Sequence, residues 1–259
     1  MSSTYNPTEM MTVAAARALG NSDVCFVGIG LPSAACNLAR LTHAPQIHLI
    51  YESGTLGTRP NVLPLSIGDG ELCETALTTI SVPEIFRYWL QGGRITVGFL
   101  GGAQVDRFGN LNSTTIGSYD HPKVRLPGSG GATEIATECG RFFIVMRHSS
   151  RSFVEHLDFL STLGHGRTGV ERRELGIKTM GPQMLVTDLC VMRPNPETCE
   201  MEVTSLHPGV TPEDVQNHTG WPIRFSSSLK ETEPPTPHEL SVLRDLYARS
   251  EGNIATVDA

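Results

Sequence analysis

The sequence predicts an α/β fold built on an open, largely parallel sheet that is flanked by helices. Apolar segments of strand length alternate along the chain with segments of helical character, which is the order of elements that parallel sheets require. Several of the strand-like segments are apolar throughout, as expected for strands that are covered on both faces. No change in composition marks a boundary, so we expect a single domain over residues 1–259.

The first expected element is a helix over residues 7–19. Asn6-Pro7-Thr8-Glu9 combines a capping residue, a proline in the first turn and a glutamate three residues after the cap. Gly20 then ends the helix. In chain order we next expect a strand at 24–27, a helix at 32–41, and strands at 47–51, 95–100, 111–116, 142–146, 184–191 and 201–206.

The C-terminal part is expected to end the fold with an edge strand and two helices. Residues 201–206 alternate in polarity, which is typical of an edge strand. Thr211-Pro212 and Thr236-Pro237 each resemble the start of a capped helix. The second of these helices is expected to end at Arg249, with a flexible tail at 251–259.

Composition excludes several classes of protein. The 259 residues include 20 Lys+Arg and 27 Asp+Glu, a net charge of −7, whereas proteins that bind nucleic acid usually carry a basic excess. No apolar run reaches the ~20 residues of a membrane helix, and the N-terminus lacks the features of a signal peptide. The six cysteines form no CxxC pair, which argues against structural zinc and for a reducing compartment. We therefore expect a cytoplasmic protein that binds no metal, nucleic acid or membrane.

The 26 glycines include several clusters that follow predicted strand ends. Ligands of open α/β sheets bind beyond the carboxyl ends of the strands. Glycine-rich turns are common in α/β proteins, but several of them at equivalent strand ends are expected to surround one cleft. The clusters are Gly28-Ile29-Gly30, Glu52-Ser53-Gly54, Gly101-Gly102-Ala103-Gln104 and Gly128-Ser129-Gly130-Gly131.

One alternative interpretation is a dinucleotide-binding module without covalent chemistry. Gly28-Ile29-Gly30 with Ser33 partly matches the dinucleotide fingerprint, and Glu52 lies near the ~20-residue offset of the acid that binds the ribose. Two features count against it, because the third glycine is absent and Glu52 is followed by a loop without a helix.

Glu52 directly follows an apolar strand, where a carboxylate is costly unless it is hydrogen-bonded or functional. A loop glutamate that caps nearby amides would explain it. A carboxylate in this position can also attack a thioester and form a covalent intermediate. Ser53 and Gly54 are small enough to let an acyl substrate approach, and other loops would supply N–H donors to the oxyanion.

Taken together and in this order, the motifs of the chain resemble the beta subunits of class I CoA-transferases, and in particular those of the glutaconate CoA-transferase type. The resemblance covers nearly the whole chain, and its set of motifs is specific although each motif alone is weak. The motifs are Tyr51-Glu52-Ser53-Gly54, residues 101–114, His121-Pro122-Lys123, residues 128–132, Thr187-Asp188, residues 207–215 and Thr219-Gly220.

The resemblance implies an α/β fold, an alpha subunit that is a separate partner chain, and an active site at the interface of the two subunits. It implies Glu52 as the nucleophile, which forms a mixed anhydride and then a glutamyl-CoA thioester. It implies no metal and no tightly bound cofactor, with coenzyme A as a substrate beside a free carboxylic or dicarboxylic acid. The remaining site residues that it implies are Ser53 and Gly54 for the substrate, and Gly102, Gln104, Gly130 and Gly131 for the oxyanion or CoA.

A second alternative uses the same scaffold. Some relatives of this fold lack the glutamate and hydrolyse or decarboxylate an acyl-CoA, whereas Glu52 is present here in its motif. Transfer is therefore favoured, although a site that admits water would hydrolyse the same intermediate. A serine hydrolase is unsupported because the chain contains no GxSxG elbow.

Overall fold

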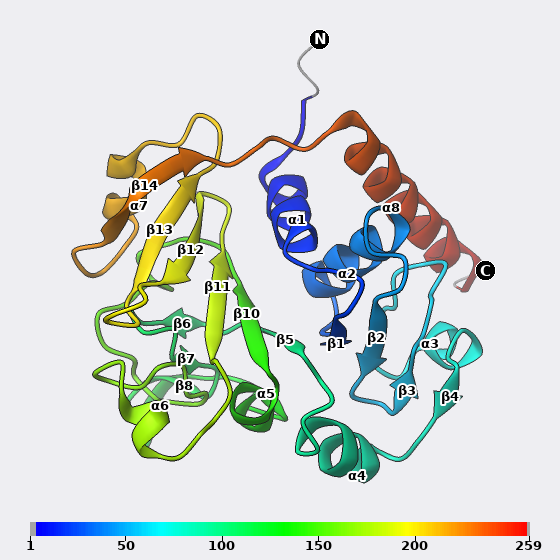
Figure 1. Ribbon diagram of the computed structural model, residues 1–259, viewed down its shortest axis with the longest axis horizontal. Coiled ribbons are helices and arrows are strands. Elements are labelled where there is room, and N and C mark those ends of the chain that lie inside the picture. The colour runs from blue at the N-terminus through cyan, green and yellow to red at the C-terminus, as the bar shows by residue number, and fades with distance from the viewer. Residues whose placement is uncertain (1–3, 258–259) are drawn as a thin grey trace. The chain divides into compact units, whose positions relative to one another are not determined.

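The computed structural model describes residues 4–257, with side chains through Glu251. The chain forms two compact units, Met1–Phe99 with Pro234–Ala259 and Leu100–Glu233. The single domain expected over residues 1–259 stays a prediction. Each unit has its own strands and helices, which Figure 1 labels.

The first unit contains the parallel strands that the sequence predicts. β1 (Val24–Phe26) pairs in parallel with both β2 (His48–Tyr51) and β5 (Val97–Leu100). Side chains of all three strands are mostly buried, as their continuous apolar sequences require. Two very short strands extend this group in antiparallel fashion, first β3 (Thr55–Leu56) and then β4 (Thr78–Thr79).

Three helices of the first unit pack against one another, namely α1 (Pro7–Arg17), α2 (Leu31–Leu41) and α8 (Pro237–Val257). α1 begins with the predicted capping box, in which Glu9 N and the Asn6 side chain lie 2.9 Å apart. The same glutamate, 6% exposed, pairs with Arg244 of α8, and Arg17 of α1 pairs with Glu239 of α8. These ion pairs join the two ends of the chain within this unit.

Short elements complete the first unit. They are α3 (Gly70–Glu74), α4 (Val82–Glu84) and the π-helical turn η1 (Ile85–Leu90). Phe86 of η1 packs edge-on against Phe26 of β1, with ring centroids 5.9 Å apart. α8 continues eight residues past the predicted end at Arg249, and residues 258–259 of the predicted tail lie outside the described residues.

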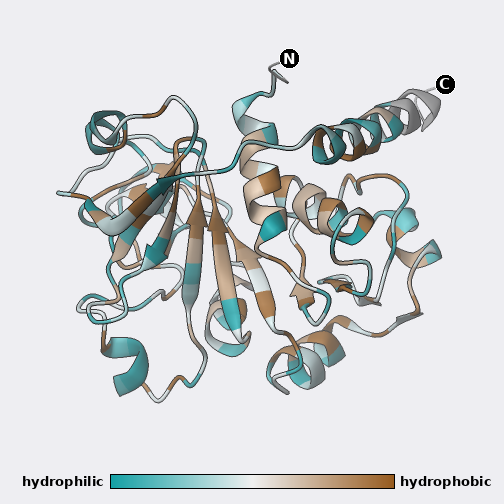
Figure 2. Ribbon diagram, turned by 45° about the horizontal axis from the view of Figure 1, so that its top comes forward, coloured by the Kyte–Doolittle hydropathy of each residue, from teal (hydrophilic) through white to brown (hydrophobic). Residues whose placement is uncertain are grey.

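The second unit contains five paired strands in the order β14-β13-β12-β11-β10. Their bounds are β10 (Arg141–Val145), β11 (Pro182–Val186), β12 (Cys190–Pro194), β13 (Met201–Leu206) and β14 (Arg224–Glu231). β10 pairs in parallel with β11, and β13 with β14, whereas the pairs that include β12 are antiparallel. Figure 2 shows β10 and β11 largely in brown, in agreement with the buried Phe142, Phe143 and Ile144.

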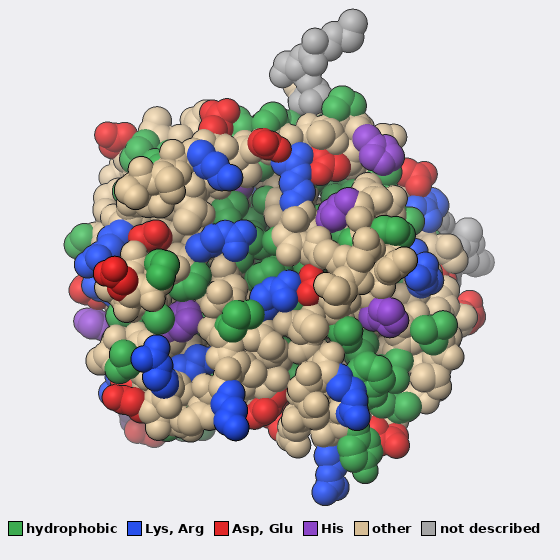
Figure 3. All heavy atoms as spheres, in the orientation of Figure 1, with side chains coloured by type: hydrophobic (Ala, Val, Ile, Leu, Met, Phe, Trp, Pro, Cys, Tyr) green, Lys and Arg blue, Asp and Glu red, His purple; other side chains and the backbone are tan. Residues whose placement is uncertain are grey.

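Two hairpins and three short helices lie beside these strands. The hairpins are β6 (Gln104–Val105) with β7 (Leu111–Asn112), and β8 (Thr115–Gly117) with β9 (Pro122–Arg125). The helices are α5 (Ala132–Glu138), α6 (Glu171–Glu174) and α7 (Pro212–Asn217). On the face drawn in Figure 3, basic and acidic side chains are interspersed.

The predicted α/β class is confirmed, but three predicted strands were wrong in detail. Residues 184–191 form parts of two antiparallel strands, because the turn at 187–189 interrupts a run that is buried on both sides. Residues 111–116 are divided between β7 and β8. β13 alternates in burial as predicted, yet it lies between β12 and β14, and β14 is the outer strand.

Candidate active site

The turn Glu52-Ser53-Gly54 connects β2 to β3 in a tight hairpin. Tyr51 and Thr55 face each other in the register, so the three residues form the whole connection. Gly54 N donates to Tyr51 O at 3.0 Å, and Ile80 N donates to Gly54 O at 2.9 Å. Gly54 has φ +109°, and a Cβ there would overlap the carbonyl oxygen of Ile80. Only glycine readily adopts this φ and also fits against the Ile80 carbonyl, so Gly54 determines the geometry of the turn.

Glu52 lies half-buried in this turn. Its side chain forms no hydrogen bond or ion pair with any residue that the structure describes. A carboxylate that is partly removed from water normally finds a partner, since burying an uncompensated charge costs free energy. Glu52 therefore differs from a capping glutamate such as Glu9, and its oxygens are available to a reacting group.

A buried hydrogen-bond chain holds the residue that precedes Glu52. The Tyr51 hydroxyl lies 2.7 Å from the Ser33 hydroxyl of α2, and both side chains are fully buried. Asn37 donates to Ser33 O at 2.9 Å, and Arg40 donates to the Asn37 side chain. Burial raises the pKa of Tyr51 far above its usual value, although the Ser33 hydrogen bond opposes this. Tyr51 is thus a neutral anchor for the end of β2.

Two hydroxyl groups beside Glu52 are buried without a hydrogen-bond partner, Ser53 Oγ and Thr55 Oγ1. Most buried polar groups are satisfied in native proteins, so a pair of unsatisfied ones in one turn is unusual. Ser53 was predicted as a substrate contact, whereas Thr55 was not singled out. Its signal in the sequence was its place one residue after Gly54, within reach of the same hairpin.

The glycine loop after β1 does not form the dinucleotide fingerprint. Gly30, with φ +82°, caps the N-terminus of α2. At the position of the third glycine, Ser33 directs its hydroxyl to Tyr51. The segment after Glu52 continues as β3 and contains no helix, as expected.

In the second unit, Gln104 lies in β6 and is only 5% exposed. Its side-chain oxygen accepts from Asn112 Nδ2 at 2.7 Å and from Asp158 N at 3.0 Å. Its Nε2 donates to Asp158 Oδ2 at 3.0 Å. Gln104 therefore ties the 158 segment to the β6–β7 hairpin. Its expected contact with an oxyanion stays a prediction. The donor in that contact would be the second hydrogen of the side-chain amide.

The predicted glycine turn 128–131 leads into α5. Gly128 and Gly130 have positive φ values, +97° and +51°. A Cβ at either position would meet no atom within 4 Å, so the space above them is open. The N–H groups of Gly130 and Gly131 have no hydrogen-bond partner among the described residues. Two free N–H donors beside open space can bind an oxyanion.

Gly102, by contrast, is closely packed, because a Cβ would lie 3.0 Å from Asn112 O.

The seven predicted site residues therefore fall into two groups. Glu52, Ser53 and Gly54 belong to the first unit, and Gly102, Gln104, Gly130 and Gly131 belong to the second. Their convergence on one site stays a prediction.

Several late motifs of the chain meet around the buried ring of His148. The ring of this residue stacks on Phe153, with centroids 3.7 Å apart. Its nitrogens lie 3.2 Å from Thr187 Oγ1 and 3.0 Å from Thr219 Oγ1. Asp188 accepts from His148 N at 2.8 Å. Burial lowers the pKa of His148 to about 4, although the nearby Asp188 carboxylate opposes this. Thr187, Asp188 and Thr219 thus hold the interior of the second unit together.

The comparisons with known proteins agree with this fold. The family model described as coenzyme A transferase matches residues 8–218, so the chain belongs to the coenzyme A transferase family. The predicted family and the predicted enzyme class are thereby confirmed.

Two relatives and one solved structure are similar over nearly the full chain. The chain is 60% identical to the B subunit of the 3-oxoadipate CoA-transferase of Pseudomonas knackmussii, over 96% of its own length and 95% of the relative. It is 36% identical to the B subunit of the glutaconate CoA-transferase of Acidaminococcus fermentans, over 93% and 92% of the two chains. The crystal structure of glutaconate coenzyme A-transferase from A. fermentans superposes with a TM-score of 0.87 at 34% identity, covering 93% and 94%.

The described part of the chain offers no candidate for a metal site or for a helix that crosses a membrane. Among the described residues, no three His, Cys, Asp or Glu side chains are grouped as metal ligands would be. Within the same part of the chain, no helix has the length and apolar character that a bilayer crossing requires.

Replacing Gly54 by alanine tests the geometry of the turn. We expect Gly54→Ala to lower the free energy of unfolding by about 3 kcal/mol or more, because it adds a steric overlap with Ile80 O to backbone strain. Gly93→Ala is the matched control, since Gly93 has φ +68° but open space around it and should cost only about 1 kcal/mol. Urea denaturation of both variants measures the difference, and equal costs would contradict the overlap.

Replacing His148 by glutamine tests its neutral, buried state. Because its pKa is about 4 in the folded chain and 6.5 is its ordinary value, the unfolded chain binds the proton first. Stability should therefore fall as the pH drops from 6.5 to 4, by up to about 3 kcal/mol from this residue. The stability difference between wild type and His148→Gln should shrink over that range, and a difference that is constant with pH would refute the assignment.

Proposed function

We propose that this chain is the B (beta) subunit of a two-subunit CoA-transferase, in which Glu52 carries the transferred group. The observation that carries the proposal is the Glu52 carboxylate itself, which has no partner among the described residues and sits in a turn fixed by Gly54. A nucleophile needs free oxygens and a defined position, and this turn supplies both.

The reaction proceeds by two exchanges at Glu52. The carboxylate attacks the acyl-CoA carbonyl, the C–S bond breaks, and a mixed anhydride forms with release of the CoA thiolate. The thiolate then attacks the glutamyl carbonyl of the anhydride, which forms the glutamyl-CoA thioester and releases the donor acid as its carboxylate. The acceptor carboxylate reverses both steps and leaves as the new acyl-CoA. Each step exchanges one activated acyl bond for another, so no energy source is needed.

The oxyanions of these steps need hydrogen-bond donors. We assign this role to the free N–H groups of Gly130 and Gly131. We assign Gln104 and Gly102 to a contact with the oxyanion or with CoA, for which Gln104 has a second amide hydrogen left. The buried hydroxyls of Ser53 and Thr55 supply further donors beside the nucleophile. Such donors lower the barrier because they are oriented before the charge develops.

The partner in this proposal is an alpha subunit, and the working enzyme is a hetero-oligomer. The support is that both relatives reported above are named as the B subunit of a CoA-transferase. Coenzyme A acts as a substrate, and the protein needs no tightly bound cofactor. The proposed location of the complex is the cytoplasm.

The acid substrate that we propose is an oxo-dicarboxylic acid of the 3-oxoadipate type. The support is the 60% identity to one chain of a 3-oxoadipate CoA-transferase, against 36% to one of a glutaconate enzyme. Hydrolase and lyase activity on the same scaffold is not favoured, because both of these relatives are named transferases and Glu52 is present. A dinucleotide-binding module is not favoured either, because Ser33 is engaged by Tyr51.

Glu52 variants of the complex test the nucleophile. We expect Glu52→Gln to lower the rate of CoA exchange by about 10³-fold or more, and Glu52→Asp by about 10²-fold because the carboxylate is drawn back. Glu74→Gln is the matched control, since Glu74 is an exposed acid of the same unit and its loss should leave the rate unchanged. Exchange is followed by chromatography of the acyl-CoA products with 3-oxoadipate, glutaconate or acetate as acceptor.

Three outcomes would count against parts of the proposal. Full exchange by Glu52→Gln would exclude Glu52 as the nucleophile. Release of free CoA at the same rate with and without an acceptor acid would identify a hydrolase. A preference for acetate over both dicarboxylic acids would refute the substrate class and leave the nucleophile in place.

A further inference from the structure

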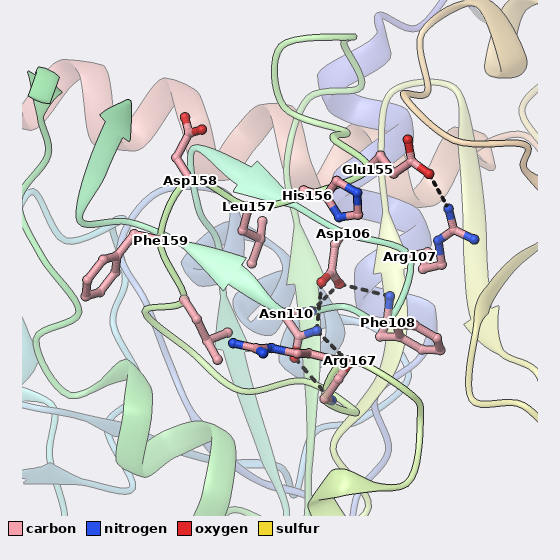
Figure 4. A pocket seen from close by; sticks show the side chains of 12 residues that line it. Asp106, Arg107, Phe108, Asn110, Glu155, His156, Leu157, Asp158, Phe159 and Arg167 are labelled. Carbon is pink, nitrogen blue, oxygen red and sulfur yellow. Dashed lines mark hydrogen bonds and ion pairs between the residues drawn. The ribbon is translucent and has the colours of Figure 1, made fainter. Parts of the chain in front are cut away.

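The second unit contains a hollow of about 940 Å³. Figure 4 shows the side chains that line it, which come from the turn between β6 and β7, from residues 155–160 and from residues 166–167. Sites for organic ligands of this kind have volumes of about 300–1,000 Å³. A short carboxylic acid would leave most of this space empty.

The acidic side chains of the hollow are already engaged by the protein. Asp106 accepts hydrogen bonds from Phe108 N, Asn110 N and Asn110 Nδ2 at 2.8–3.0 Å. Glu155 pairs with Arg107 at 3.3 Å. Asp158 Oδ2 accepts from Gln104 Nε2 and Gly117 N, both at 3.0 Å. These three carboxylates therefore hold the walls of the hollow in place.

Two donor side chains of the hollow are not engaged. The Arg167 guanidinium and the His156 ring form no hydrogen bond or ion pair with the residues that the structure describes. The backbone at Arg167 is nevertheless fixed, because its N–H donates to Glu171 Oε2 at 2.8 Å and Gly166 before it has φ +84°. The exposed guanidinium extends from this held backbone with all its N–H groups free, and such a group is well suited to bind phosphate.

Aromatic side chains provide part of the wall. Phe159 lines the hollow and stacks on Tyr119, with centroids 5.2 Å apart and ring planes 25° apart. The guanidinium of Arg125 lies 4.9 Å from the centroid of the Tyr119 ring. This stack of three groups holds Phe159 as a firm apolar surface, of the kind on which nucleotide bases stack.

From these features we infer that the hollow binds the phosphorylated nucleotide end of coenzyme A, with Arg167 and His156 facing its phosphates and Phe159 beside its base. The inference rests on the proposed function, in which CoA is a substrate. It adds a location for the part of CoA that takes no part in the chemistry. Binding energy from such a remote group can be used at the reacting carbonyl.

The test compares acyl-CoA with the corresponding acyl-pantetheine, which lacks the nucleotide, as donors for the complex of this chain with its partner subunit. We expect Arg167→Ala to raise the KM for acyl-CoA by about tenfold and to leave the KM for acyl-pantetheine unchanged. Arg167→Lys keeps the charge without the fork of donors and should give an intermediate value. Arg173→Ala removes an exposed arginine of α6 outside the hollow and is the control.

A second measurement needs no catalysis. Binding of adenosine 3′,5′-bisphosphate to the complex, measured by calorimetry, should weaken about tenfold in Arg167→Ala and remain at the wild-type level in Glu52→Gln. The inference is wrong if Arg167→Ala raises the KM values for both donors equally or raises neither. It is also wrong if the bisphosphate binds wild type and Arg167→Ala equally. If the wild-type complex exchanges no CoA but still binds the bisphosphate in a way that depends on Arg167, the proposed function is refuted and this binding site is not.

Discussion

The contact between Gly54 and the carbonyl oxygen of Ile80 is the constraint on which the Glu52 turn depends. Gly54 has a left-handed backbone and no room for a side chain. Its carbonyl accepts from Ile80 N, so the same residue joins β4 to the hairpin of β2 and β3. Glycine is the one residue that allows this close approach, and the approach holds the backbone of the turn that contains Glu52.

Glu52 lies between a residue that is firmly held and residues whose polar groups are unsatisfied. Tyr51, which precedes it, is hydrogen-bonded to Ser33 in a fully buried contact. In the turn, the Glu52 carboxylate and the hydroxyls of Ser53 and Thr55 lack partners among the described residues. Leaving polar groups unsatisfied costs stability, and such groups persist mainly where function uses them. This contrast with the well-paired Glu9 is the physical reason to regard Glu52 as the reacting group.

The sequence predicted the parts of the fold that carry a strong local signal. The capping box of α1 and the buried strands β1 and β2 follow from their residues, and so does the turn after β2. The run 184–191 concealed a turn because apolar residues continue through it, and burial on both faces removes any alternation. Strands of two residues, such as β3, have no period to detect. The hollow beside Arg167 was invisible because its walls come from segments about fifty residues apart.

The covalent bond that we propose between Glu52 and the transferred group can be tested directly. The complex is incubated with acyl-CoA in the absence of an acceptor acid, then digested, and the peptide that contains Glu52 is analysed by mass spectrometry. We expect a peptide that carries coenzyme A on Glu52, and reduction by borohydride at the same residue. An unmodified Glu52 peptide in a preparation that exchanges CoA, or a modification on another residue, would contradict it.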